Sequence, residues 1–419
     1  MSTAFWHPFA DMSKVKDAPL TIIGGEGCHV TDDQGNRYLD ATASLWYMNV
    51  GHGRQEIIDA IARQGKDLAA YSTFGDVSNR PVEQLAERLS KLAPSEGSKV
   101  IFVGGGGEAV DTASKLARRY FATLGQPERR YILHRHHGYH GTNGYGTSLA
   151  GIEANRTGFG DLIRETREVP YDDAEALEAA IVEIGEENVA AFIVEPVIGA
   201  GGVYPPPPGY LETIATICER HGVLLIVDSV ICGFGRLGTY FAAERFGIQP
   251  DLITFAKGVT SGYLPLGGVI ASEKIARPFF DGPNAPTFRH GPTYAGHPLC
   301  CAAALANLDI LDRESLIERG ADLEKPLFET LLSATRTSSI ISDTRGGVGL
   351  LGAVELSQDY LTANPTGVVQ LQNEMRREGV LVRSLIGCVA VSPPLIISLN
   401  EIEQIGAAFS NALHRLEHH

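Results

Sequence analysis

The sequence predicts an α/β protein with a large domain built on a mostly parallel β-sheet and a smaller α+β domain. Six short apolar runs in the central part of the chain alternate with longer stretches of helical periodicity. These runs lack the alternation of half-exposed strands, as expected for parallel strands buried on both faces. A length of 419 residues also exceeds what one simple core organises and suits two domains. The six predicted strands are residues 100–103, 130–134, 190–194, 223–227, 251–255 and 266–271.

The two flanks of the chain have a different pattern. Residues 27–39 contain two strand-like runs joined by the turn sequence Asp-Gln-Gly-Asn, which predicts a β-hairpin. After about residue 305, helical stretches are followed by strand candidates at 349–356 and 380–383. We therefore expect both flanks to belong to the smaller domain. The predicted division is a large domain at 56–304, a small domain made of 1–55 and 305–415, and an expression-tag remnant at 416–419.

The composition limits the classes of partner. Hydrophobic residues make up 44% of the chain and charged residues 20%, as in ordinary globular proteins. The formal net charge of -15 argues against nucleic acid and against an anionic membrane surface as partners. No run approaches the roughly 18 apolar residues of a membrane helix, and no signal peptide is evident. The six cysteines have spacings that suit neither zinc nor a disulfide framework, so we expect reduced thiols, no metal and a cytoplasmic protein.

A glycine loop is the first candidate functional feature. Four consecutive glycines, residues 104–107, follow the first predicted strand and precede a helical stretch that starts at Glu108. The free N–H groups of a helix's first turn and the helix dipole favour an anion, and glycine lets a phosphate approach the backbone closely. A tight turn without a ligand would show the same pattern, so the loop needs support from other residues.

Two charged residues stand at the ends of later predicted strands. Asp228 follows residues 223–227, and Lys257 closely follows residues 251–255. Ligands of open α/β sheets lie at the carboxyl ends of the strands, and an ammonium group is costly to bury unpaired. Either residue alone could be structural, as a turn cap or a surface lysine. Together with the glycine loop they suit pyridoxal 5′-phosphate: the loop anchors the phosphate, Asp228 pairs with the pyridine nitrogen, and Lys257 forms the Schiff base.

The sequence resembles the class III aminotransferases, also called the omega-transaminase group, over nearly its whole length. The segments that carry the resemblance are residues 138–141, 195–197, 225–238, 251–268 and 290–298. The resemblance implies fold type I of the pyridoxal-phosphate enzymes, the aspartate aminotransferase-like fold. It also implies a homodimer with cofactor sites at the subunit interface, with further pairing into a tetramer left open.

The resemblance also implies which residues hold the cofactor. Lys257 would carry it as the internal aldimine, and Asp228 would bind the pyridine nitrogen. Tyr139 would stack on one face of the ring and Val230 on the other. We interpret His140, beside Tyr139, as structural rather than catalytic.

The phosphate and the substrate have their own expected residues. Gly106 and Gly107 fall where the family binds phosphate, and Thr293 would reach the phosphate from the partner subunit. Trp46 falls where related amine–pyruvate enzymes line the substrate pocket. Arg383 matches the arginine that binds a substrate carboxylate.

Three positions depart from the family pattern. Gly107 stands where the family has a serine, and the missing hydroxyl predicts weaker cofactor retention, by about 1 kcal/mol. Ser229 stands where the family has a glutamate, and the sequence leaves the consequence open. Ala200 replaces the glutamate of enzymes that act on 4-aminobutyrate or ornithine, which favours the amine– or omega-amino-acid–pyruvate group.

We expect a transaminase that moves an amino group from a primary amine or omega-amino acid to a keto acid such as pyruvate, by a ping-pong mechanism through Lys257. An aminomutase, racemase or decarboxylase on the same scaffold is the alternative. A nicotinamide-dependent oxidoreductase is disfavoured, because the strand after the glycine loop ends at His134 without an acidic residue for a ribose. A non-enzymatic binding protein is disfavoured by the joint presence of Asp228, Lys257 and Arg383.

Overall fold

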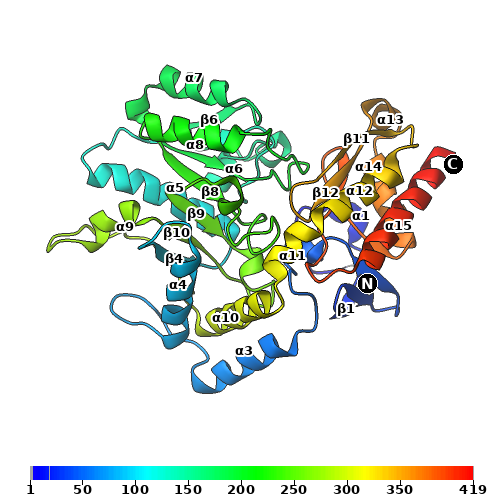
Figure 1. The fold of residues 1–419 in the computed structure, drawn as a ribbon, viewed down its shortest axis with the longest axis horizontal. Helices are drawn as coiled ribbons and strands as arrows, with labels where there is room; N and C mark the ends of the chain where they lie inside the picture. The colour runs from blue at the N-terminus through cyan, green and yellow to red at the C-terminus, as the bar shows by residue number, and fades with distance from the viewer. Residues whose placement is uncertain (1–2, 18, 419) are drawn as a thin grey trace.

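A seven-stranded sheet forms the centre of the larger body in the computed structural model, which describes residues 3–17 and 19–418 (Figure 1). Its strands follow the order β4-β10-β9-β8-β7-β5-β6. The neighbours from β9 to β6 pair in parallel, whereas β10 is antiparallel to both β9 and β4. The predicted fold class, with a mostly parallel sheet, is therefore confirmed. The strands are β4 Lys99–Val103, β5 Tyr131–Arg135, β6 Thr166–Val169, β7 Val189–Val194, β8 Leu224–Asp228, β9 Leu252–Phe255 and β10 Gly267–Ala271.

All six predicted strands of this sheet form within about a residue of the expected bounds, and β6 is the one strand of this sheet that the sequence did not reveal. Its sequence is Thr-Arg-Glu-Val, of which only Val169 is buried. It lies at the edge of the sheet, where one side of the strand faces solvent. An edge strand of this kind needs no apolar run, so the search for apolar runs in the sequence did not find it.

Alternate side chains of the central strands enter two separate apolar layers. In β8, Leu224 and Ile226 pack in the layer of α5, whereas Leu225 and Val227 pack in the layer of α7 and α8. Helices therefore cover both faces of the sheet, which is why the strands are continuously apolar (Figure 1). These helices are α5 Gly106–Thr123, α7 Ala174–Ile184 and α8 Tyr210–Arg220.

The two flanks of the chain meet in a second body, drawn blue and orange to red in Figure 1. The predicted hairpin is present as the antiparallel pair β2–β3, and β13 pairs in parallel with β3, so both flanks share the sheet β1-β2-β3-β13. A further sheet has the order β11-β12-β15-β14. The strands are β1 Ile22–Glu26, β2 His29–Asp32, β3 Arg37–Asp40, β11 Ile341–Arg345, β12 Gly352–Leu356, β13 Val380–Leu381, β14 Arg383–Ser384 and β15 Cys388–Val391.

Two predicted strands of the C-terminal flank need correction. The segment 380–383 is not one strand: Val380 pairs with Leu39 in the first sheet, whereas Arg383 pairs with Ala390 in the second. The chain changes sheet between them, which no local pattern reports. The strand expected at 349–356 begins only at Gly352, because Gly349 adopts a left-handed φ of 79°.

The pairing of β3 with β13 supports the division into a large domain at 56–304 and a small domain made of 1–55 and 305–415, which we retain as a proposal. Of the predicted tag remnant, His419 lies outside the described residues, while Glu417 extends α15 and accepts hydrogen bonds from Ser338 and Ser339.

The remaining helices of the described chain are α1 Met12–Val15, α2 Ala43–Trp46, α3 Gln55–Asp67, α4 Arg80–Leu92, α6 Gly144–Ser148, α9 Glu273–Phe280, α10 Pro298–Arg313, α11 Leu316–Asp322, α12 Glu324–Thr335, α13 Gln358–Ala363, α14 Gly367–Arg377 and α15 Leu399–His418. Within the described residues, no helix combines the length and the apolar character that crossing a membrane requires.

Candidate active site

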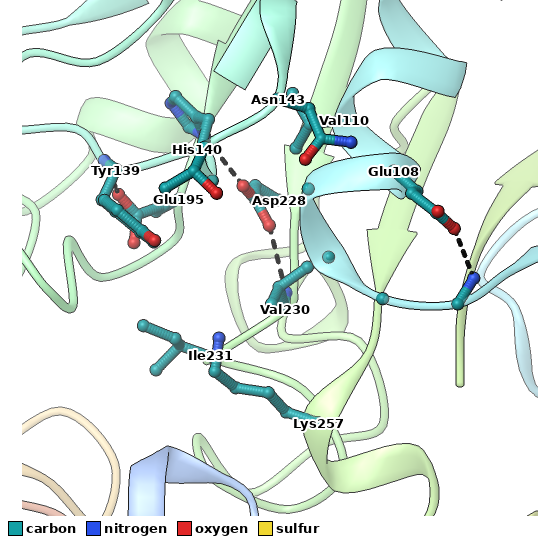
Figure 2. A pocket seen from close by; sticks show the side chains of 16 residues that line it. Glu108, Val110, Tyr139, His140, Asn143, Glu195, Asp228, Val230, Ile231 and Lys257 are labelled. Carbon is teal, nitrogen blue, oxygen red and sulfur yellow. Dashed lines mark hydrogen bonds and ion pairs between the residues drawn. The ribbon is translucent and has the colours of Figure 1, made fainter. Parts of the chain in front are cut away.

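A cavity of about 390 Å³ lies at the carboxyl ends of the central strands (Figure 2). It brings together all the predicted cofactor residues except Thr293. The sheet explains this meeting, because parallel strands end at one edge and their following loops converge there. The cavity is lined by residues 104–108, Val110, residues 139–143, Glu195, Asp228, Val230, Ile231 and Lys257.

The glycine loop forms an open backbone cradle on one wall of this cavity. Helix α5 begins at Gly106, and no side chain caps its first turn. A Cβ atom added to Gly106 would lie 2.8 Å from Cγ1 of Val230, and one added to Gly141 would lie 2.7 Å from Cα of Gly107. Side chains therefore do not fit where these loops meet. The free N–H groups of the helix start, with the helix dipole, suit a phosphate.

Asp228 ends β8 with both carboxylate oxygens engaged. Oδ2 accepts from Nδ1 of His140 at 2.7 Å, and Oδ1 accepts from the hydroxyl of Thr254 at 2.9 Å and from the N–H of Val230 at 3.1 Å. The residue is only 3% exposed, so water does not compete for these bonds. The three donors hold the carboxylate in one orientation. One of them, His140, also lines the cavity, and its interpretation as a structural residue stays a prediction. Thr254 carried no signal in the sequence.

Lys257 opens a short 3-10 turn directly after β9, Lys257–Val259, labelled η4. Its backbone has a left-handed φ of 48°, which is rare for a residue with a side chain. Figure 2 shows the side chain extended beneath Val230 and Ile231. Burial lowers the pKa of Lys257 below 10.5, against the opposing charges of Asp228 and Glu195. The amine therefore loses its proton more easily than a surface lysine does.

Glu195 is a site residue whose role the sequence did not reveal. It follows β7, and its Oε1 accepts from the N–H of Tyr139 at 2.9 Å while its Oε2 accepts from the N–H of Gly199 at 3.0 Å. It thereby fastens two loops that border the cavity. Burial raises its pKa, while the charge of His140 and the two backbone N–H groups oppose the rise.

A second cavity, of about 330 Å³, adjoins the first. Tyr139, Ile231 and Lys257 line both, so the second cavity opens onto the lysine. It also contains Trp46 and Arg383, as predicted for the substrate pocket. Its other lining residues are Phe9, Leu45, Ile152, Asn155, Ala200, Ser384, Leu385 and Ile386, of which the sequence had indicated only Ala200.

Thr293 is the one predicted site residue that lies away from both cavities. It lines a separate hollow of about 480 Å³ together with Tyr71, Phe74 and Tyr294, among others. These three aromatic side chains are 64%, 57% and 74% exposed, which is unusual for large apolar groups gathered in one place. Within a single chain, Thr293 therefore does not complete the cofactor site.

The structure gives a local reason for two of the three departures from the family pattern, Ser229 and Gly107. Ser229 is fully buried, and its hydroxyl donates to the carbonyl of Phe241 at 2.6 Å, so it does not line the cavity. A Cβ atom on Gly107 would lie 3.0 Å from Oδ1 of Asn143. The space of the missing serine is thus already bordered by an amide that lines the same cavity.

The cavity suits a small phosphorylated aldehyde, because an amine with a lowered pKa faces an anion cradle and a fixed carboxylate across it. Together with the sheet order, this defines a pyridoxal-phosphate enzyme of fold type I. The chain belongs to the class III aminotransferases, since the family model described as Aminotransferase class-III matches residues 12–413. It is a pyridoxal 5′-phosphate-dependent aminotransferase.

Several known proteins are similar along nearly the whole chain. Putrescine–pyruvate aminotransferase of Pseudomonas aeruginosa is 38% identical, covering 95% of this chain and 91% of that protein. An (S)-enantioselective omega-transaminase from Thermomicrobium roseum has a TM-score of 0.93 at 38% identity, over 98% of this chain and 96% of that one. An amine transaminase from an uncultivated Pseudomonas species, solved with bound pyridoxal phosphate, has a TM-score of 0.92 at 35% identity, over 99% of both chains.

Proposed function

We propose that this enzyme transfers the amino group of a primary amine or omega-amino acid to a keto acid such as pyruvate. The observation that carries the proposal is the second cavity, where apolar walls join Lys257 to Arg383. Among the described residues Arg383 forms no ion pair, so its charge is available to a substrate carboxylate. The similarity to enzymes named putrescine–pyruvate aminotransferase and β-alanine–pyruvate aminotransferase supports this choice.

The residues of the first cavity have separate binding tasks. Backbone N–H groups of Gly106 and Gly107 would hold the phosphate, and Asp228 would pair with the pyridine nitrogen. Tyr139 and Val230 would pack against the two faces of the ring. Bound pyridoxal 5′-phosphate supplies an electron sink for the negative charge that develops on the substrate carbon. Asp228 supports this sink because its carboxylate favours a protonated ring nitrogen.

Lys257 moves the proton at its Nζ atom. When the cofactor is bound, Nζ would take a proton from the substrate carbon as a base and would deliver it to a carbon of the cofactor as an acid. Its lowered pKa makes the neutral amine accessible for the first of these tasks. Arg383 then orients the keto acid, so that the same steps run in reverse in the second half of a ping-pong cycle.

A panel of amine donors with pyruvate as acceptor tests the proposed function. We expect alanine and the donor's carbonyl product in equal amounts. Release of carbon dioxide, racemisation or rearrangement without alanine would instead identify the decarboxylase, racemase or aminomutase. In the same assay, Arg383→Gln should raise the KM for pyruvate about tenfold or more while sparing an acceptor aldehyde that has no carboxylate.

We infer that the active unit is a homodimer, with the hollow around Thr293 placed at the interface. The support is the exposed aromatic cluster Tyr71, Phe74 and Tyr294, together with the distance of Thr293 from its own cavity. Thr293 of one subunit would then reach the phosphate of the other. Light scattering of the holoenzyme gives the mass, and a monomer that is fully active would contradict the inference.

Replacement of Gly107 tests how the phosphate is held without the family's serine. Gly107→Ser alone should crowd Asn143 and leave cofactor release unchanged or faster. In an Asn143→Ala background the serine has room, and we expect its hydroxyl to slow release about tenfold. The measurement is the loss of cofactor absorbance during dialysis. Equal rates for Asn143→Ala and the double variant would show that position 107 gives the phosphate no side-chain hydrogen bond.

A further inference from the structure

The turn that carries Lys257 is held in a strained conformation by a side chain distant in sequence. Lys257 and Ser261 both have a left-handed φ of 48°, and they bracket the turn on its two sides. Neither is glycine, so each conformation costs free energy and persists only where the surroundings enforce it. The residue that makes the enforcing contacts is Asn307, in the middle of α10.

The amide of Asn307 engages two carbonyls between the strained residues. Its Nδ2 donates to the carbonyl of Gly258 at 2.9 Å and to that of Val259 at 3.0 Å. Its Oδ1 accepts from the hydroxyl of Ser261 at 2.6 Å. Asn307 is fully buried, so these bonds face no competition from water. Both amide hydrogens and the amide oxygen therefore have partners inside the turn.

The two carbonyls fix the direction of this network. The carbonyls of Gly258 and Val259 can only accept, so they require the NH₂ group of Asn307, and Oδ1 is left to accept from the Ser261 hydroxyl. The backbone N–H of Val50 donates to Oγ of Ser261 at 3.2 Å, which ties the N-terminal flank to the same network. A flipped amide would place its oxygen against both carbonyls and lose those two bonds. The N-terminal flank and α10 thus hold the lysine turn together.

We propose that Asn307 is a positioning residue for Lys257. By binding the carbonyls of Gly258 and Val259, it holds the lysine turn in the left-handed conformation that directs Nζ to the place where the two cavities adjoin. The inference rests on the proposed function, in which Lys257 is the reacting lysine. Asn307 lines neither cavity, so it acts only through the turn. Its loss should slow the reactions of Nζ and leave the cradle for the phosphate and ring intact.

Two ligands separate positioning of the lysine from general damage to the site. Pyridoxal 5′-phosphate must condense with Nζ, whereas pyridoxamine 5′-phosphate presents the same ring and phosphate but cannot. In cofactor-free protein, the condensation rate is followed by trapping the imine with borohydride and locating the modified peptide. The affinity for pyridoxamine 5′-phosphate is measured by fluorescence titration.

Asn307→Leu, similar in size but without donors, should slow trapping at position 257 about tenfold or more, with little change in pyridoxamine 5′-phosphate affinity. Ser261→Ala, a milder change, should act in the same direction if Asn307→Leu does not fold. Thr335→Val is the matched control, because it removes buried hydrogen bonds from α12 and should leave the trapping rate unchanged.

The outcomes decide whether Asn307 positions Lys257. An unchanged trapping rate in the folded Asn307 or Ser261 variant overturns the proposal, and so does a parallel loss of affinity for both ligands. If the unmodified protein itself gives no adduct at Lys257, the proposed function fails. That result differs from a failure of the positioning proposal, in which the unmodified and variant proteins form the trapped adduct at equal rates.

Discussion

Replacement of Lys257 by alanine is expected to abolish turnover, lowering kcat by about 10⁴-fold or more, since one amine serves as nucleophile, base and acid. The geometric reason is that Lys257 supplies the only lysine amine that lines the two cavities among the described residues. The measurement is alanine formation from the best donor and pyruvate. Retention of unmodified activity would remove the basis of the proposed mechanism.

The same variant should remain folded, which separates catalysis from stability. Burial lowers the pKa of Lys257 in the folded protein below 10.5, so between that lowered pKa and 10.5 the unfolded chain binds more protons than the folded one. Stability therefore rises with pH through that window, and Lys257→Ala should flatten the rise and cost no stability at pH 7. Thermal unfolding of the cofactor-free protein, measured at steps from pH 7 up to 10.5, checks the sign. Lys274→Ala, which removes an exposed ion pair with Asp251, is the control.

Replacement of Asp228 by asparagine is expected to lower kcat by about 10²- to 10³-fold, because the ring nitrogen then loses the carboxylate that favours its protonated form. The change keeps the size of the side chain, and an amide oxygen can still accept from Thr254. The loss should fall on kcat more than on KM for the amine, since Asp228 lies in the first cavity and not in the second. Steady-state kinetics with pyruvate measure both.

Asp32→Asn provides the matched control for this variant. Asp32 is as buried as Asp228, at 3% exposure, and it also accepts several hydrogen bonds, but it lies in the β2–β3 hairpin. We expect it to lower the unfolding temperature and to leave kcat unchanged. Equal losses of kcat in the two variants would mean that Asp228 supports the fold and has no special electrostatic role.

The fold class, and the meeting of Asp228, Lys257 and the glycine loop at one edge of the sheet, could be predicted because their signals are local. Asp228 and Lys257 each stand directly after a buried apolar run, and the glycine loop follows another. Burial on both faces is visible as an uninterrupted apolar run, and a polar residue at its end marks the ligand edge of the sheet. The split of 380–383 between two sheets escaped prediction, because strand partners are chosen by packing and not by the strand's own residues.

The partners of the site residues could not be predicted for the same reason. His140 and Thr254 reach Asp228 from other segments, and although both lie in segments that carry the family resemblance, their own sequence does not reveal that they bond to Asp228. Phe9 lines the second cavity only because the N-terminal segment folds back to it. Each of these contacts depends on where two distant elements come to lie.

The sequence by itself determined a mostly parallel α/β sheet with a glycine loop, a carboxylate and a lysine at the ends of its strands. The tertiary structure alone decided how Lys257 is aimed, because Asn307 reaches the lysine turn across 49 residues of chain. It also decided that Trp46 and Arg383 share one cavity with that lysine. Periodic burial and strand ends are properties of neighbouring residues, whereas the orientation of a reacting atom is set by packing between elements that the chain order separates.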